Sequence, residues 1–160
     1  MKLHVVAVGH KPPDWVAAGF EEYARRMPRS ARIDLIEVKP APRGRRTLSE
    51  ALVSRVLAEE KSRIFAAIPS GCVKIALDER GKQLTTAELG RRLEGWMQGG
   101  RDVAFVIGSA DGLAASVKQG AAAVVALSAL TLPHSLCRVL LAEQLYRAAS
   151  LVAGHPYHRE

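Results

Sequence analysis

The sequence predicts an α/β fold in which a mostly parallel sheet is covered by helices on both faces. Stretches of helical period separate short apolar runs that are rich in β-branched residues, at 3–9, 33–38, 72–77, 103–108 and 122–127. These runs are apolar on both faces, as strands between two layers of helices must be. With 160 residues and 48% hydrophobic composition, the chain has enough apolar material for a single domain spanning residues 1–160.

The segments between these runs carry signals for helix ends. Asp14 is placed to cap a first helix that runs to about residue 26. Two further helices are predicted to open with the Thr and Glu spacing of a capping box, at Thr47 with Glu50 and at Thr85 with Glu88. Gly99 and Gly100 are predicted to end the third helix.

The last helix, from about Pro133 to Ala153, has an unusually broad apolar surface. Its proline stands at an early position, where the missing N–H costs nothing. The apolar residues cover more than one stripe, and they are Leu136, Val139, Leu140, Leu141, Leu145, Tyr146, Leu151 and Val152. Such a helix either lies deep in the core or packs on another subunit as well.

The positive charge is concentrated in one short stretch. The formal charge is +7, and residues 25–46 hold eight basic residues against Asp34 and Glu37, so this stretch alone carries +6. A local basic patch favours a polyanion such as RNA or a membrane surface, and the clustering makes RNA the stronger prediction. Candidates for phosphate contacts are Arg25, Arg26, Arg29, Arg43, Arg45 and Arg46. The alternative is a solvated basic face.

Composition also limits where the protein works and what it binds. No apolar run approaches the ~20 residues of a membrane span, and residues 1–9 lack the length and cleavage site of a signal peptide. A soluble, cytoplasmic protein is therefore expected. Cys72 and Cys137 are far apart, and neither has metal-ligand spacing with another Cys or His. We expect reduced, buried thiols and no metal.

Ligands in open α/β sheets bind beyond the carboxyl ends of the strands, which singles out loops 77–82, 108–112 and 127–132. Loop Gly108-Ser-Ala-Asp-Gly112 carries two glycines, which let the backbone approach a ligand or adopt positive φ. Neither G-x-G-x-x-G nor G-x-x-x-x-G-K-[ST] occurs, so dinucleotide and P-loop sites lose their main support. A plain turn remains the alternative for this loop.

The last third of the chain has the most specific motifs. They are Leu127-Ser-Ala-Leu-Thr-Leu-Pro-His134, Arg138-Val-Leu-Leu-Ala-Glu-Gln-Leu-Tyr-Arg147 and the terminal His155-Pro-Tyr-His-Arg-Glu160. With these motifs, and over nearly its whole length, the chain resembles the bacterial ribosomal RNA large-subunit methyltransferase H family of SPOUT methyltransferases. The resemblance implies a C-terminal trefoil knot whose deep cleft binds S-adenosylmethionine. Carried over by position, the cleft would be lined by Leu77, Gly108, Leu127, Ser128, Ala129, Leu130, Thr131 and Leu132.

One residue departs from the family pattern. The family commonly has a second glycine directly after Gly108, where this chain has Ser109. A serine fits if φ is negative there, whereas positive φ would strain the loop by about 1 kcal/mol or more. We expect the serine to be tolerated.

The reaction implied by the resemblance is methylation of N3 of a pseudouridine in 23S rRNA, on assembled ribosomes, by a homodimer that needs no metal. One subunit would supply the cofactor cleft, and the partner's surface would complete the RNA site. In the tail, His155 or His158 could accept the N3 proton, Tyr157 could stack on or hydrogen-bond the base, and Arg159 could hold phosphate or favour the anionic base. Arg147, about two turns earlier, could point into the active site or clamp RNA.

Other interpretations stay open at this point. Without the resemblance, the terminal cluster is a solvated tail, and His134 only occupies the start of a helix. One rival function is a ribosome-associated assembly factor that keeps the fold without catalysis. Another is a different nucleotide-binding α/β enzyme, in which loop 108–112 would cradle phosphate.

Overall fold

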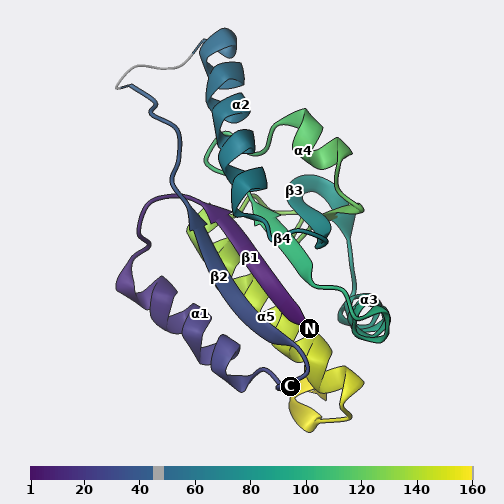
Figure 1. Cartoon of the computed structure of the whole chain (residues 1–160). Helices are drawn as coiled ribbons and strands as arrows, with labels where there is room; N and C mark the ends of the chain where they lie inside the picture. The colour runs from purple at the N-terminus through teal and green to yellow at the C-terminus, as the bar shows by residue number, and fades with distance from the viewer. Residues whose placement is uncertain (45–48, 160) are drawn as a thin grey trace.

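The computed structural model describes residues 1–44 and 49–159, apart from the side chains of His158 and Arg159. Within them, the chain forms one parallel sheet in the order β2-β1-β4-β3-β5 (Figure 1). The strands are β1 (Lys2–Val8), β2 (Arg32–Val38), β3 (Val73–Gln83), β4 (Val103–Ile107) and β5 (Ala123–Ala126). The predicted α/β fold with a parallel sheet is therefore confirmed.

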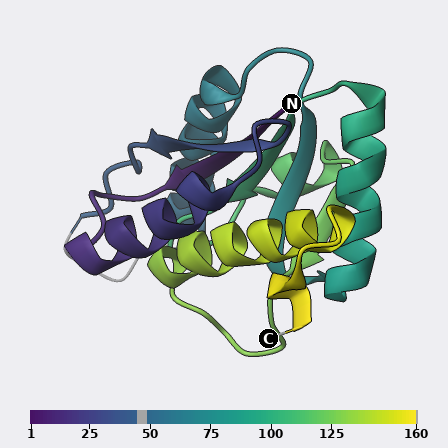
Figure 2. The same ribbon diagram turned by 90° about the horizontal axis from the view of Figure 1, so that it is seen from below.

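Helices cover both faces of the sheet, as predicted. They are α1 (Asp14–Arg26), α2 (Glu50–Ala67), α3 (Thr86–Gly99), α4 (Ala115–Gln119) and α5 (His134–Val152), followed by the 3-10 turn η1 (Pro156–Arg159). Figure 2 shows α1, α5 and α3 side by side across one face. Side chains of these three helices share one core, whereas α2 and α4 contribute to a second core on the opposite face.

The two cores use alternate residues of the same strands. In β1, Leu3 and Val5 belong to the core under α1, α3 and α5, while Val6 and Val8 belong to the core under α2 and α4. All four side chains are fully buried. This alternation explains why the strands are continuous apolar runs, because each strand has helices on both of its faces.

Two of the predicted helix starts need correction. Asp14 is the first helical residue of α1 and not its cap, so its charge lies in the first turn, where the helix dipole favours it. Helix α2 is capped by Ser49, whose hydroxyl accepts a hydrogen bond from the Leu52 N–H at 3.4 Å. The predicted cap, Thr47, lies outside the described residues.

The capping box of α3 is confirmed. The Thr85 hydroxyl accepts a hydrogen bond from the Glu88 N–H at 3.1 Å, and the Glu88 carboxylate accepts one from the Thr85 N–H at 2.8 Å. This backbone hydrogen bond, with help from Lys82, lowers the pKa of Glu88 to about 2. Gly100, with φ of 63°, ends the helix.

Helix α5 lies in the core between α1 and α3. Leu141, Ala142, Leu145 and Ala148 are buried, and among its residues only Val152, at the end, is exposed. Its broad apolarity therefore reflects contacts with the sheet and with two neighbouring helices. No described helix is long and apolar enough to cross a membrane.

Both cysteines are free thiols. Burial raises the pKa of each thiol. Cys72 is buried as predicted, but Cys137 is only partly buried, so that part of the prediction is wrong.

Strand β3 continues beyond the predicted apolar run and pairs with β5 twice. Residues 75–77 pair with 123–125, and after an irregular segment Lys82 and Gln83 pair with Val125 and Ala126. Between these pairings Gly81 approaches the β5 backbone closely, because a Cβ built at Gly81 would lie 2.6 to 2.8 Å from backbone atoms of Val124 and Val125. The chain can approach the β5 backbone this closely only with a glycine at position 81.

We predict that Gly81→Ala destabilises the protein by about 3 kcal/mol, because neither backbone can give way to the added methyl group. The matched control is Gly95→Ala in α3, where an added Cβ meets nothing within 4 Å and should stabilise by about 0.5 to 1 kcal/mol. Urea denaturation at one fixed protein concentration measures both effects. Equal midpoints for Gly81→Ala and the unchanged protein would show that the backbones at Gly81 and β5 are not in close contact.

Candidate cofactor cleft and active site

The loops after β3, β4 and β5 meet around an open cleft of about 540 Å³. This volume lies within the usual range for sites that bind small molecules and cofactors. The cleft is lined by seven of the eight residues predicted to bind the cofactor, namely Leu77, Gly108, Leu127, Ser128, Leu130, Thr131 and Leu132. Ala129 lies in the same loop but is not part of the lining. Cofactor binding by these residues stays a prediction.

The glycines of loop 108–112 are required by the loop itself. A Cβ at Gly108 would lie 2.4 Å from the Gly112 carbonyl oxygen, and Gly112 has φ of +81°. Its N–H donates to the Ser109 carbonyl at 2.9 Å, which closes the turn. No described residue other than glycine has positive φ, so φ of Ser109 is not positive. The serine therefore fits this loop without backbone strain, and a second glycine is not needed here.

Ser109 also takes part in a buried polar network centred on Glu60 of α2. The Glu60 carboxylate is 2% exposed and accepts hydrogen bonds from the Ala41 N–H at 3.1 Å, from Arg43 at 3.1 Å and from the Ser109 hydroxyl at 2.7 Å. Arg43 additionally pairs with Asp111. Three donors offset the cost of burying this charge, and together they join α2, the segment after β2 and the glycine loop.

The other wall of the cleft is tied by polar contacts between loops. Lys118 of α4 pairs with Asp78 at 2.9 Å, and the Thr131 hydroxyl donates to Glu79 at 3.2 Å. Burial alone would raise the pKa of Asp78, but hydrogen bonds from Lys118 and from the Arg80 N–H outweigh it and lower that pKa. The lining thus carries charges of both signs, and two of its carboxylates, Asp78 and Asp111, already have cationic partners.

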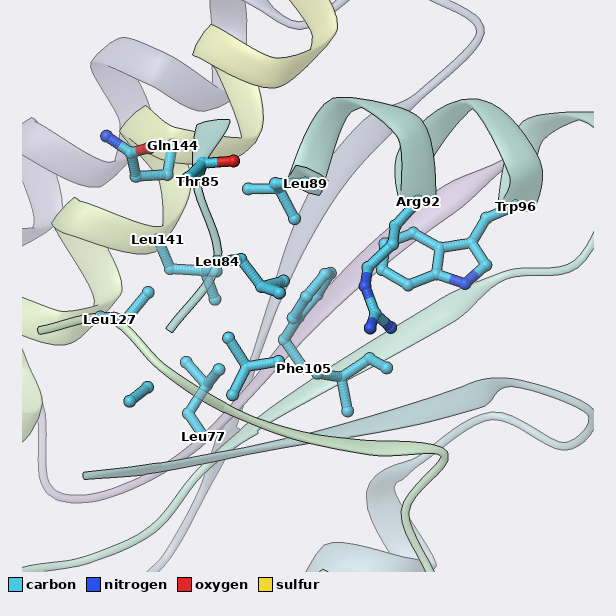
Figure 3. Close-up of a pocket in the computed structure, with 13 residues that line it drawn as sticks. Leu77, Leu84, Thr85, Leu89, Arg92, Trp96, Phe105, Leu127, Leu141 and Gln144 are labelled. Carbon is cyan, nitrogen blue, oxygen red and sulfur yellow. The ribbon is translucent and has the colours of Figure 1, made fainter. Parts of the chain in front are cut away.

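A second, apolar pocket lies between α3, α5 and the sheet (Figure 3). Trp96 of α3 packs edge-on against Phe105 of β4, with ring centroids 5.9 Å apart. The space is about 70 Å³, too small for a nucleoside cofactor. It shares Leu77 and Leu127 with the open cleft. These two leucines therefore separate the two hollows, and only the open cleft has room for a cofactor.

Helix α5 begins in the wall of the open cleft. Its first residue, His134, lines the cleft together with Cys137. Burial lowers the pKa of His134, and the nearby guanidinium groups of Arg138 and Arg43 lower it further. Arg138 is 1% exposed and pairs with Glu37 of β2 at 2.9 Å. The sequence interpretation gave His134 no role. Its position directly after loop 127–132 was the available signal.

The terminal tail folds back onto the middle and second half of α5. The Tyr157 ring lies 4.6 Å from the Tyr146 ring, and its hydroxyl donates to Glu143 at 3.3 Å. Burial raises the pKa of Tyr157 to about 12, with further contributions from Tyr23 and Glu143. The tail of this chain is therefore folded onto its own helices, and the solvated terminus considered above does not describe Tyr157.

Arg147 holds this tail in place. Its guanidinium pairs with Glu143 at 2.7 Å, donates to the Tyr157 carbonyl at 3.3 Å and lies 4.8 Å from the centre of the Tyr157 ring. His155 accepts a hydrogen bond from the Tyr157 N–H at 3.3 Å. The side chains of His158 and Arg159 lie outside the described part of the chain. The two roles considered for Arg147, in the active site or on RNA, stay predictions.

The structure thus brings the predicted cofactor residues together, but none of the described catalytic candidates, Arg147, His155 and Tyr157, lines the cleft. His134 and Cys137 of the first turn of α5 line the cleft, whereas Tyr157 packs on Glu143, Tyr146 and Arg147, about 13 to 20 Å further along the helix from His134. Within residues 1–44 and 49–159, no group of three His, Cys, Asp or Glu side chains is arranged to hold a metal ion.

Comparison with known proteins adds the chemical class. A family model described as "Predicted SPOUT methyltransferase" matches residues 1–158. Proteins named ribosomal RNA large subunit methyltransferase H are 57% identical to the chain, over 159 residues in Nitrosospira multiformis and over 160 residues in Burkholderia mallei. In both cases the match covers 99% of this chain and 99% of the relative.

Solved structures share the fold at low sequence identity. A probable methylase family protein from Haemophilus influenzae matches with a TM-score of 0.55 at 13% identity, covering 97% of this chain and 68% of its own. A probable methyltransferase from Bordetella pertussis matches with a TM-score of 0.52 at 13% identity, covering 92% and 95%. Because the family model and the full-length relatives agree, the chain belongs to the ribosomal RNA large subunit methyltransferase H family of SPOUT methyltransferases, whose methyl donor is S-adenosylmethionine.

Proposed function

We propose that this protein transfers the methyl group of S-adenosylmethionine to N3 of a pseudouridine in 23S rRNA, acting on assembled ribosomes. The observation that carries the proposal is the cleft of about 540 Å³ where three loops meet at the carboxyl ends of parallel strands, in a chain of this family. The relatives' name supplies the class of substrate.

The residues of the cleft fit the cofactor. Leu77, Leu127 and Leu132 offer apolar side chains for an adenine ring, and the backbone of loop 127–132 offers N–H and C=O groups for its polar edge. When bound, S-adenosylmethionine supplies a methyl group activated by a sulfonium. The protein must bring the nucleophile into line with that methyl group and remove the N3 proton.

A homodimer explains the position of the tail. None of the described tail residues lines the chain's own cleft, and Tyr157 packs instead on Glu143, Tyr146 and Arg147 of α5, so we infer that the tail completes the cleft of a second copy. Large apolar side chains left uncovered in the single chain support an interface, because Trp15 at the start of α1 is 59% exposed and Leu130 beside the cleft is 74% exposed. In this arrangement Tyr157 and Arg159 would contact the base or its phosphate, as the resemblance implies.

We also infer that the chain forms the trefoil knot of the family. Supporting this, β3 pairs with β5 on both sides of an irregular segment, and Gly81 passes against the β5 backbone. The chain then runs from β5 through loop 127–132 into α5, so the cofactor loops are those that a knot would hold together.

The rRNA surface would draw on the basic stretch, but its arginines differ in availability. Arg43 is committed to Glu60 and Asp111. Arg25 and Arg26 pair with glutamates one turn earlier on α1, and such exposed pairs are weak enough to exchange for phosphate. Arg45 and Arg46 lie outside the described residues. We therefore assign phosphate contacts to the basic residues of segment 25–46 other than Arg43.

The direct test is to incubate the protein with methyl-labelled S-adenosylmethionine and ribosomes from a strain that lacks this modification, and then to analyse the nucleosides of the digested RNA. Label is expected in N3-methylpseudouridine. Confirmed cofactor binding without labelled RNA would reject the proposed substrate. A protein that binds no cofactor would favour the non-catalytic assembly factor.

The origin of the tail can be tested in mixed dimers made from two differently tagged chains. One chain lacks residues 155–160, and the other carries Leu132→Arg, which places a charge in the cleft while leaving the tail intact. If the tail acts on the partner, the purified mixed dimer keeps about half of the activity, since one of its two equivalent sites is whole. Each homodimer should be inactive. An inactive mixed dimer with normal folding would mean that the tail serves its own chain.

Charge reversal of Arg45 and Arg46 to Glu should weaken ribosome binding and lower the slope of log affinity against log salt by about 1.5 to 2, because two phosphate contacts are lost. Cofactor affinity should not change, since the two arginines are assigned to phosphate contacts and not to the cofactor. Arg91→Glu, on the exposed surface of α3, controls for net charge. A salt slope equal to that of the unchanged protein would remove these two residues from the RNA surface.

A further inference from the structure

His134 is the one described histidine in the cofactor cleft. It is the first residue of α5, and it follows loop 127–132, which forms one wall of the cleft. Its imidazole packs against the end of β1, where a Cβ at Gly9 would lie 3.5 Å from Nε2. The ring is therefore held by the fold itself, at the site where the methyl donor would bind.

We propose that His134 is the base that accepts the N3 proton of the target nucleotide, in the same chain that binds the methyl donor. This proposal rests on the proposed function. In this proposal His134 takes the place of His155 or His158 as the proton acceptor. The partner's tail would then hold the target nucleobase. A general base must lie within hydrogen-bond reach of the proton it removes, or one water away, and His134 already lines the cleft.

The charges around His134 favour the form that can act as a base. Arg138 faces it from the same helix, and Arg43 faces it from the segment after β2. Their carboxylate partners are Glu37 for Arg138, and Glu60 and Asp111 for Arg43. Burial and the two guanidinium groups lower the pKa of His134, so the imidazole is neutral at pH 7. Among the described residues, none forms a hydrogen bond with it.

The proposed step balances as a direct transfer. The N3 lone pair forms a bond to the methyl carbon while the bond from that carbon to sulfur breaks, and the electron pair of the broken bond stays on sulfur. The N3 proton passes to the free ring nitrogen of His134. The resulting imidazolium lies near Arg138 and Arg43, and this repulsion favours release of its proton to water as the products leave. The next cycle then begins with neutral His134.

The first test is the pH dependence of kcat for His134→Gln with ribosomes as substrate. In the unchanged protein, kcat should rise as the pH increases through the lowered pKa of His134 and then level off. In the variant, kcat should be about 10²- to 10⁴-fold lower and should no longer rise through the pKa of His134. Its deficit should shrink at high pH, where N3 ionises unaided. His10→Gln removes an exposed histidine outside the cleft lining and should change neither.

A second readout does not depend on turnover. In an NMR titration, the imidazole signal of His134 should report a pKa below 6.5, and S-adenosylmethionine should lower it further because a sulfonium cation disfavours the imidazolium. The signal of His10 should not respond to the cofactor. Calorimetry should give equal cofactor affinity for His134→Gln and the unchanged protein.

Three results would overturn the proposal. In the first, His134→Gln keeps full kcat and its pH dependence, while His155→Gln or His158→Gln loses both kcat and the pH dependence. That result would place the proton acceptor in the tail. Loss of cofactor affinity in proportion to the loss of kcat would make His134 a cofactor ligand. Absence of any methyl transfer by the unchanged protein would remove the proposed function itself, and this proposal with it.

Discussion

The close contact between β3 and β5 is the constraint on which the cofactor edge of this protein depends. Strand β3 pairs with β5, leaves it through residues 78–81 and pairs with it again, and Gly81 allows the two backbones to touch. The irregular segment lies against loop 127–132, where Thr131 donates to Glu79. Loop 127–132 leads into α5, whose first residue, His134, lines the same cleft.

Sequence patterns predicted the parts of the fold that depend on burial. Strands covered on both faces must be apolar throughout, which made β1 and β4 recognisable. The second half of β3 was missed because residues 78–83 are mostly polar, although Lys82 and Gln83 pair with β5 again. The cap of α2 was placed two residues early because Thr47 and Glu50 have the spacing of a capping box. The observed cap, Ser49, has no glutamate three residues later and therefore does not show this spacing.

The site was predicted in part for a similar reason. Loops at the carboxyl ends of parallel strands converge, so the cleft followed from the fold class and from the family resemblance. The buried Glu60 could not be found in this way, because its partners Ala41, Arg43 and Ser109 come from segments that only the folded chain brings together. The tail was grouped with the cleft by resemblance alone. In the single chain the tail packs on Glu143, Tyr146 and Arg147 of α5, and none of its described residues lines the cleft.

The cleft and the tail of one chain do not meet, and the central claim is that two copies bring them together. A crystal structure of the protein with S-adenosylhomocysteine tests this claim most directly. The account predicts the adenine ring beside Leu77 and Leu127 in the open cleft, with the partner's tail over the same cleft. An adenine bound beside Trp96 between α3 and α5, or a dimer whose tails lie far from both clefts, would contradict it.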